Sequence, residues 1–281
     1  MRIVIVGARG QLGGAMVHEC SRTHEVVSLD RTALDITDDD AVDRTLRALQ
    51  PEALVNCTGY NDVDGAEAHP VEALRVNAFA VRSMARVARN LGASLVHFST
   101  DFVFDGTASA PMTEDVAPNP RSAYAVSKLL GEWFAADAPA HYVLRVESLF
   151  GVGPGGRSKG SVAAIVNGLR AGQVVRVFGD RTVSPTHVED ASKATLALLE
   201  RRSASGLYHC VNSGYGTWHD VGAEAARLLG VTPNFQVVSV ADVNLPAARP
   251  QYCALSNAKL QAAIGFDLPT WQQALARCVG A

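Results

Sequence analysis

Residues 1–13 read MRIVIVGARGQLG, and this stretch decides the fold class. The apolar, β-branched run at 3–6 predicts a strand, and Gly7, Gly10 and Gly13 follow it at the start of a predicted helix. Glycines in such a turn allow backbone angles that are closed to other residues, and they let a pyrophosphate approach the free N–H groups of the helix. The stretch therefore predicts the opening strand, turn and helix of a dinucleotide-binding fold.

The rest of the first half alternates short apolar runs with amphipathic segments. Strands are predicted at residues 26–29, 53–56, 94–98 and 142–146, and helices at 12–20, 38–49 and 70–91. Strands that are apolar on both faces and separated by helices indicate a parallel sheet that is covered on both sides. We therefore expect an α/β protein with a doubly wound, Rossmann-like parallel sheet.

A glycine-rich stretch at residues 151–160 interrupts this rhythm. Beyond it we expect helices at 161–171, 188–200, 218–229 and 271–279 and a strand at 174–178. The organisation predicted is a dinucleotide-binding domain over 1–150 and a smaller, C-terminal, mainly substrate-binding region over 151–281, interleaved with the last sheet elements. The interrupting stretch carries Arg157 and Lys159. It is either a lid that orders over a substrate diphosphate or a solvated linker.

Composition excludes several classes of protein. The chain of 281 residues has a net charge of −3 and no concentrated basic stripe, so we expect no nucleic-acid partner. No apolar run approaches the roughly 18 residues of a membrane span, and the N-terminus lacks the core of a signal peptide. The five cysteines are odd in number and scattered, and the histidines form no metal-binding pattern. We expect a cytoplasmic protein with reduced thiols, no membrane contact and no metal.

Two charged residues at the end of the second predicted strand bear on the cofactor. Asp30, which lies 17 residues after Gly13, is placed to accept hydrogen bonds from an adenosine ribose. Arg31 follows it and can neutralise a 2′-phosphate. Both NADH and NADPH therefore stay open as cofactors, and Asp30 has the alternative of being an ordinary loop acid.

A second constellation supplies acid–base chemistry. Tyr124 and Lys128 are four residues apart on a helix predicted to begin near Ser122, so they share one face of it. We expect the ammonium to stabilise the phenolate and lower the pKa of Tyr124, which can then exchange a proton with a carbonyl oxygen. Thr100 and Asp101 end the fourth strand at the carboxyl edge of the sheet, where ligands bind, and the hydroxyl can steady the same oxygen.

These motifs belong to a longer series that carries a family resemblance. The series is the glycine turn, VNCTGY at 55–60, VNA at 76–78, STDFVFDG at 99–106, YAVSK at 124–128, LR at 144–145, SPT at 184–186 and ARP at 248–250. Over nearly its whole length the sequence resembles the dTDP-4-dehydrorhamnose reductase group of the extended short-chain dehydrogenase/reductase superfamily. The resemblance implies NAD(P)H-dependent reduction of the 4-keto group of a nucleotide-linked deoxy sugar.

The resemblance also implies roles for individual residues. The catalytic residues would be Thr100, Tyr124 and Lys128. Cofactor contacts would fall on Gly10, Gln11, Leu12, Asp30, Asp35, Ile36, Gly59, Tyr60 and Asn61, beside Gly7, Gly13, Arg31, Tyr124 and Lys128. On the substrate side we expect Thr100, Asp101, Glu147, Arg157 and Lys159. The partner is a nucleotide-sugar substrate, and a homodimer is the candidate assembly.

One stretch departs from the family pattern. Such reductases usually have Thr-Ser-Trp after the arginine of the strand before the lid, and the tryptophan lines the sugar pocket, whereas this chain has Val146-Glu147-Ser148. Its three tryptophans lie elsewhere. Phe102 stands in place of a more usual tyrosine, a change expected to be harmless. Glu147 either accepts hydrogen bonds from a sugar hydroxyl or amino group, or it points into the packing or pairs with Arg145.

Two other functions are compatible with parts of the pattern. The methionine adenosyltransferase beta subunit, a non-catalytic NADP-binding regulatory protein, is similar across the same motifs and also lacks the tryptophan. An epimerase or dehydratase would need an acid–base pair beside Tyr124, and the sequence indicates none there.

Overall fold

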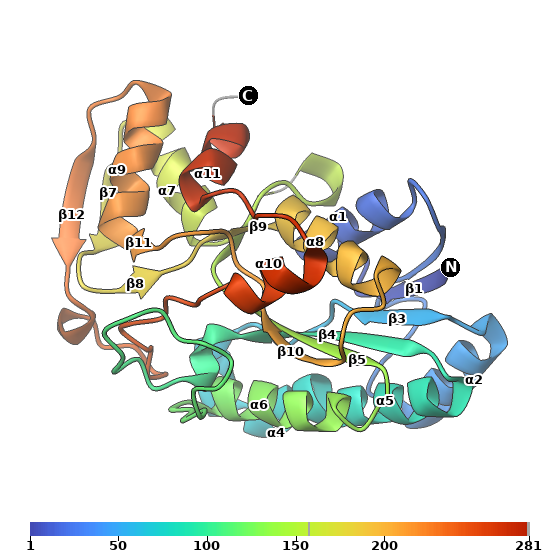
Figure 1. The fold of residues 1–281 in the computed structure, drawn as a ribbon. Helices are drawn as coiled ribbons and strands as arrows, with labels where there is room; N and C mark the ends of the chain where they lie inside the picture. Colours follow the sequence, from blue (N-terminus) through green and yellow to red (C-terminus); the bar gives the residue numbers. More distant parts are fainter. Residues whose placement is uncertain (157, 280–281) are drawn as a thin grey trace.

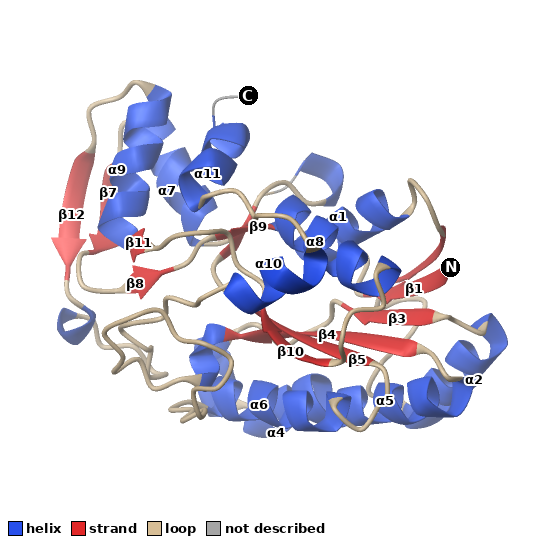
Figure 2. Cartoon of the chain, in the orientation of Figure 1, coloured by secondary structure: helices blue, strands red, loops and turns tan. Residues whose placement is uncertain are grey.

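The computed structural model describes residues 1–156 and 158–279. Its main feature is a six-stranded sheet with the order β10-β5-β4-β3-β1-β2, in which each pair of neighbours is parallel (Figure 2). The strands are β1 (Arg2–Val6), β2 (Glu25–Leu29), β3 (Ala53–Asn56), β4 (Ser94–Thr100), β5 (His141–Val146) and β10 (Gly206–His209). The predicted doubly wound parallel sheet is confirmed.

Helices cover both faces of this sheet (Figure 1). One face carries α2 (Asp39–Leu49), α4 (Pro70–Leu74), α5 (Ala80–Leu91) and α6 (Ala123–Ala135), with α3 (Val63–Ala68) against α6; the other carries α1 (Gln11–Cys20), α8 (Val188–Glu200) and α10 (Ala258–Ile264). Side chains of a strand alternate between faces, so Ile3 and Ile5 pack in one core cluster and Val4 and Val6 in the other. All four are buried, which explains the uninterrupted apolar run that opens the sequence.

The helix predicted at 70–91 is three elements instead of one. Between α4 and α5 the chain forms a π-helical turn, Arg75–Phe79. The wider turn contains Asn77, whose buried amide is hydrogen-bonded to the backbone of Tyr60 and to the hydroxyl of Ser127. Such turns are frequent at functional sites, and here the amide ties two distant segments together.

The second half of the chain builds a smaller part around a separate apolar cluster. It comprises β6 (Leu149–Phe150), α7 (Ser161–Arg170), β7 (Val174–Phe178), β8 (Thr182–Val183), β9 (Thr186–His187), β11 (Gly216–Thr217), α9 (Trp218–Leu229), β12 (Asn234–Val238) and α11 (Trp271–Val279), with 3₁₀ turns η3 (Pro154–Gly156) and η4 (Val240–Asp242). Trp218 and Trp271 lie in its core. The second half also supplies β10 to the main sheet, and α8 and α10 to its helical cover. The division at residue 150 into a dinucleotide-binding domain and a mainly substrate-binding region therefore stays a prediction.

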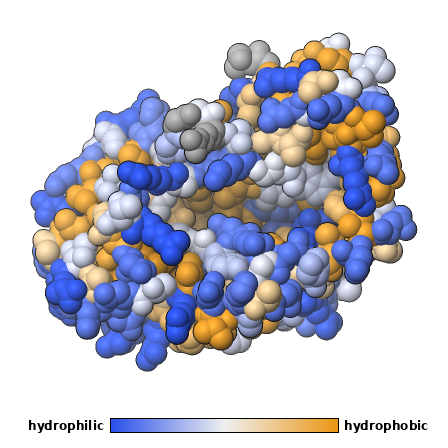
Figure 3. Space-filling model, turned by 180° about the vertical axis from the view of Figure 1, so that it is seen from behind, coloured by the Kyte–Doolittle hydropathy of each residue, from blue (hydrophilic) through white to orange (hydrophobic). Residues whose placement is uncertain are grey.

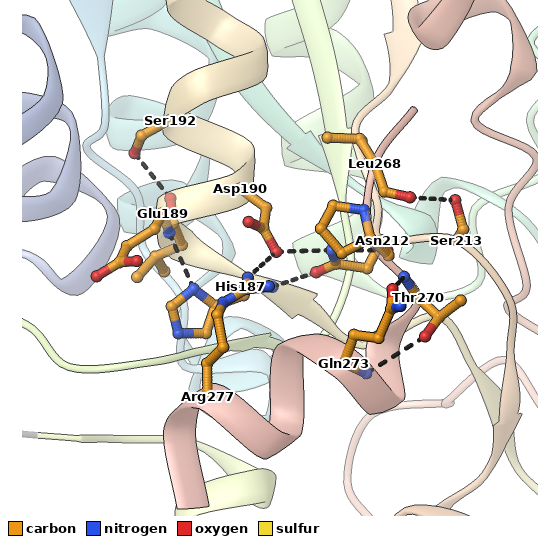
Figure 4. Close-up of polar contacts among 12 residues, drawn as sticks. His187, Glu189, Asp190, Ser192, Asn212, Ser213, Leu268, Thr270, Gln273 and Arg277 are labelled. Carbon is orange, nitrogen blue, oxygen red and sulfur yellow. Dashed lines mark hydrogen bonds and ion pairs between the residues drawn. The ribbon is translucent and has the colours of Figure 1, made fainter. Parts of the chain in front are cut away.

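A buried polar junction joins the two parts (Figure 4). Asp190, in the first turn of α8, accepts a hydrogen bond from the amide of Asn212 at 2.8 Å and pairs with Arg277 of α11. The Asn212 oxygen in turn accepts from the backbone N–H of His187 at 2.7 Å. Because each buried polar group here has a partner, the junction holds α11 to the start of α8.

None of the helices in the described part of the chain is long and apolar enough to cross a membrane. All five cysteines carry free thiols, as the sequence predicts.

Candidate active site

The glycine turn between β1 and α1 has the shape that a dinucleotide needs. Gly7 adopts φ 84°, a conformation that favours glycine. A Cβ on Gly13 would lie 2.2 Å from the carbonyl oxygen of Gly7, so a larger residue would push the helix away from the strand. Gly10 is the N-cap of α1 and offers no side chain to its first turn. The turn therefore leaves an anion-binding helix end open to a pyrophosphate.

A cavity of about 640 Å³ extends from this turn over the carboxyl edge of the sheet. Of the residues predicted to contact cofactor, it is lined by Gly7, Gly10, Asp30, Arg31, Asp35, Ile36, Gly59, Tyr60 and Asn61. Gln11, Leu12 and Gly13 lie beside it on α1, where the Leu12 side chain packs into the core. The cavity is also lined by Arg9, Thr58, Glu72 and Arg75, which sequence reasoning did not single out.

Arg9 is the most informative of these additions. Its Nε lies 2.6 Å from Oδ2 of Asp30. The other oxygen of Asp30 accepts hydrogen bonds from the hydroxyl and N–H of Thr32 and the N–H of Ala33. The Thr32 hydroxyl, followed by the backbone donors and Arg9, lowers the pKa of Asp30, so its carboxylate is held ionised in the lining of the cavity. The signal was present in the sequence, because Arg9 stands between two glycines of the turn.

The pair that the sequence predicts to be catalytic, Tyr124 and Lys128, lies on α6. Ser122 caps the helix by accepting a hydrogen bond from the N–H of Ala125, and both Tyr124 and Lys128 are buried. The ammonium of Lys128 donates to the carbonyl oxygen of Phe98 at 2.5 Å. Burial lowers the pKa of Lys128 to about 8. A lysine with this pKa still carries its charge at neutral pH.

The expectation that Lys128 lowers the pKa of Tyr124 is wrong for this structure. Burial is the largest cause acting on the phenol and raises its pKa, the Asp101 carboxylate raises it further, and the Thr100 hydroxyl partly offsets both. The ammonium of Lys128 is directed to a backbone carbonyl instead. A phenol with a raised pKa stays protonated at neutral pH, which is the form that can donate a proton to a carbonyl oxygen.

Thr100 and Asp101 stand at the carboxyl end of β4, as predicted. The Thr100 hydroxyl donates to Oδ1 of Asp101 at 2.9 Å. Asp101 begins the 3₁₀ turn η2 (Asp101–Val103) and is 3% exposed. Burial raises the pKa of its carboxyl, and the nearby Arg181 guanidinium only partly offsets this. The structure thus brings Thr100, Asp101 and Tyr124 together.

Glu147 is placed beside this group. It is 1% exposed, and its Oε2 accepts a hydrogen bond from the backbone N–H of Ser184 at 2.7 Å. It does not pair with Arg145, which forms a buried ion pair with Glu132 at 2.7 Å. A carboxyl oxygen of Glu147, one of Asp101 and the sulfur of Cys253 lie within 4.8 Å of one another. The sequence did not predict that Glu147 lies beside Asp101, because these residues are far apart in the chain and only the fold brings them together.

The glycine-rich stretch after β6 lies against α1. Its Gly151 carbonyl accepts hydrogen bonds from the Gln11 amide at 2.7 Å and the Ser158 hydroxyl at 3.0 Å. A Cβ on Gly14 would meet the ring of Pro154 at 2.3 Å. Lys159 is exposed, and Arg157 lies outside the described residues.

Seen from behind, the molecular surface is hollowed between the larger and smaller parts (Figure 3).

The fold and the residues at its carboxyl edge indicate the class of protein. A doubly wound sheet with a glycine turn after β1, an acidic end to β2, and a buried Tyr124–Lys128 pair near Thr100 is the arrangement of an NAD(P)-dependent oxidoreductase of the short-chain dehydrogenase/reductase type.

Comparison with known proteins defines the family. Residues 1–281 match the family described as RmlD substrate binding domain, and the chain belongs to that family. It is 35% identical to the dTDP-4-dehydrorhamnose reductase of Mycobacterium tuberculosis, with 100% of this chain and 93% of that protein covered. It is 34% identical to a probable dTDP-4,6-dihydroxy-2-methyloxan-3-one 4-ketoreductase of Streptomyces antibioticus, with coverage of 98% and 93%. The structure of dTDP-4-dehydrorhamnose reductase from Bacillus anthracis in complex with NADP matches with a TM-score of 0.92 at 28% identity, covering 99% and 98% of the two chains.

Proposed function

We propose that the protein uses NADPH or NADH to reduce the 4-keto group of a nucleotide-linked deoxy sugar. The observation that carries the proposal is the position of the Tyr124 phenol. It is buried and protonated, it meets the Thr100 hydroxyl at the carboxyl edge of the sheet, and it lies on the same edge as the glycine turn. Family membership over the full chain supports the same reaction.

Each residue of the site has a task in this reaction. The bound cofactor supplies a hydride, with its two electrons, to the keto carbon. Tyr124 donates its proton to the carbonyl oxygen, and the Thr100 hydroxyl hydrogen-bonds the same oxygen. The ammonium of Lys128 is hydrogen-bonded to the Phe98 carbonyl and is charged at neutral pH. Its task is to hold the nicotinamide ribose near the phenol.

For the cofactor we propose that both NADPH and NADH are used. Asp30 offers an ionised carboxylate to ribose hydroxyls, whereas Arg9 and Arg31 line the same cavity and can neutralise a 2′-phosphate. The NADP in the related Bacillus anthracis structure supports the second use. Gly7, Gly10, Gln11, Leu12 and Gly13 would hold the pyrophosphate through the turn and the start of α1.

For the substrate we propose a keto-sugar nucleotide that differs from that of the ordinary rhamnose enzyme. Ser148 has φ 44°, a strained backbone conformation for serine, at the position where a tryptophan is usual. Two tryptophans are in the core of the smaller part, and Trp133 is on the exposed surface of α6. Losing the aromatic face gives up stacking area against the sugar and leaves room for a bulkier or more polar substituent.

Two further proposals concern context. We infer a homodimer, whose test is sedimentation of the purified protein, and a cytoplasmic location, which the free thiols support.

The proposal is tested with purified protein, a panel of 4-keto sugar nucleotides and both reduced cofactors. We expect cofactor oxidation that matches the alcohol formed mole for mole with at least one sugar. Tyr124→Phe should bind cofactor and give no turnover. The regulatory alternative is correct if the protein binds NADPH, shows no oxidation of NADPH with any keto sugar of the panel, and co-purifies with a synthetase.

A further inference from the structure

We infer that Asp101 and Glu147 form a buried carboxyl pair that keeps one proton, and that this proton restores the Tyr124 phenol through the Thr100 hydroxyl after each reduction. The inference rests on the proposed role of Tyr124 as proton donor. It assigns Glu147, which departs from the family pattern, the task of a positioning residue that acts through Asp101.

The geometry of the pair leaves two oxygens without partners. Oδ2 of Asp101 and Oε1 of Glu147 are both buried and have no hydrogen-bond partner among the residues that the structure describes. Their carboxyl groups approach within 4.8 Å. Two buried carboxylates this close cannot both ionise at low cost, so one proton is held strongly.

The charges around the Asp101–Glu147 pair indicate that the pair keeps one proton. The only guanidinium that the structure places at the pair is that of Arg181, whose Nη2 lies 4.0 Å from Oδ2 of Asp101 and 3.8 Å from the sulfur of Cys253. One positive charge balances one carboxylate. Burial and the mutual repulsion of the acids raise the pKa of Glu147 well above its ordinary value, and burial raises that of the Cys253 thiol, which stays neutral. The remaining neighbours that face the pair are the neutral Ser184 N–H and the phenols of Tyr252 and Tyr124.

The Thr100 hydroxyl stands between the pair and the reaction. It donates a hydrogen bond to Oδ1 of Asp101 at 2.9 Å, and it lies close enough to the Tyr124 phenol to lower the pKa of that group. When the new alcohol takes the phenol's proton, an O–H bond breaks at Tyr124 and one forms on the sugar. The Thr100 hydroxyl then turns from Asp101 to the phenolate and gives it a proton, Thr100 takes the proton that the carboxyl pair holds through Asp101, and solvent returns one proton to the pair before the next turnover.

The pH dependence of kcat distinguishes this from a structural role. Reduction should slow as pH rises through the pKa of the pair. In Glu147→Gln, Asp101 faces Arg181 without a second acid, so its pKa falls and the alkaline limb should move at least about one pH unit lower. At neutral pH kcat should fall about tenfold to hundredfold while both KM values stay within about threefold. Cys253→Ser, in the same cluster but with both acids kept, should retain the wild-type profile.

A second measurement needs no substitution. Carbon-13 NMR of the side-chain carboxyls in the wild-type protein should show one buried carboxyl still protonated at neutral pH. Two ionised carboxylates, or a Glu147→Gln variant with an unchanged pH profile, would overturn the inference. Because the NMR experiment needs no substrate, a protonated pair in a protein that reduces no keto sugar would refute the proposed function while leaving the carboxyl pair in place.

Discussion

Nε of Arg9 lies 2.6 Å from Oδ2 of Asp30, so the glycine turn and the end of β2 are joined by an ion pair in the lining of the cavity proposed to bind the cofactor. The guanidinium is largely exposed and free to turn toward a phosphate. We expect Arg9→Ala to weaken NADPH binding about tenfold and NADH binding less than about threefold, because only NADPH offers the 2′-phosphate. Fluorescence titration with each cofactor measures this.

Arg31→Ala is the matched comparison, because Arg31 lines the same cavity. If the wild-type protein prefers one cofactor by about a thousandfold, dual use is wrong. If Arg31→Ala alone lowers NADPH affinity, the phosphate contact belongs to the residue first indicated by the sequence and not to Arg9.

Tyr124 and Lys128 should separate in their effects. Tyr124→Phe removes the donated proton but keeps the buried ring, so kcat should fall at least about a hundredfold with cofactor affinity unchanged within a few-fold. Lys128→Ala should lower both kcat and cofactor affinity. Because the Lys128 ammonium loses its charge as pH rises through about 8, cofactor affinity should also decline above that pH. Most activity retained in Tyr124→Phe would remove the phenol from the proton-donor role.

Ser148 tests the altered sugar pocket. We expect the unmodified protein to reduce dTDP-4-dehydrorhamnose poorly compared with another keto-sugar nucleotide. Ser148→Trp should shift the ratio of kcat/KM values toward the rhamnose precursor, because the indole restores stacking area. Ser148→Gly is the control, since it relaxes the φ of 44° without adding a ring. Efficient reduction of the rhamnose precursor by the wild type would restore the ordinary substrate.

The basic residues of the glycine-rich stretch should affect binding more than turnover. Replacing Arg157 and Lys159 together with alanine should raise the KM of the nucleotide sugar several-fold and leave kcat nearly unchanged, because they would pair with the diphosphate. Steady-state kinetics decide this, and unaltered constants would make the stretch a linker.

Breaking the buried ion pair of Arg145 and Glu132 should lower the free energy of unfolding more than breaking an ion pair on the surface. Both side chains are almost fully buried, and Glu132 also accepts a hydrogen bond from Ser99. Glu132→Gln leaves the guanidinium without a charge partner, so the free energy of unfolding should fall by about 3 kcal/mol. Glu224→Gln, which breaks the surface pair with Arg227, should change the denaturation midpoint little. Equal effects would show that the inner pair is solvated.

The sequence predicted what depends on local pattern. The apolar run of β1, the glycine turn and the spacing of Tyr124 and Lys128 are each contained within a few consecutive residues, and the structure builds strand, turn and helix from them. The π-helical turn at Asn77 was missed, because the hydrogen bonds that its side chain makes there join it to the backbone of Tyr60, 17 residues away, and no local pattern indicates them.

The sequence could not predict which distant residues meet. Glu147, Ser184 and Cys253 come from three separate segments, and only the folded chain brings them to Asp101. The predicted lowering of the pKa of Tyr124 was wrong for the same reason. Spacing puts the lysine on the right face of the helix, but burial of the phenol and the Phe98 carbonyl that takes the ammonium are tertiary effects.

Transfer of a labelled hydride tests whether the protein reduces the 4-keto group of the sugar. NADPH carrying deuterium at its transferable position is incubated with the protein and the best keto-sugar nucleotide of the panel, and the product is analysed by NMR. We expect one deuterium at C4 of the sugar for every cofactor oxidised. Product formed without net oxidation of cofactor, or with deuterium at another carbon or none, would contradict reduction of the 4-keto group.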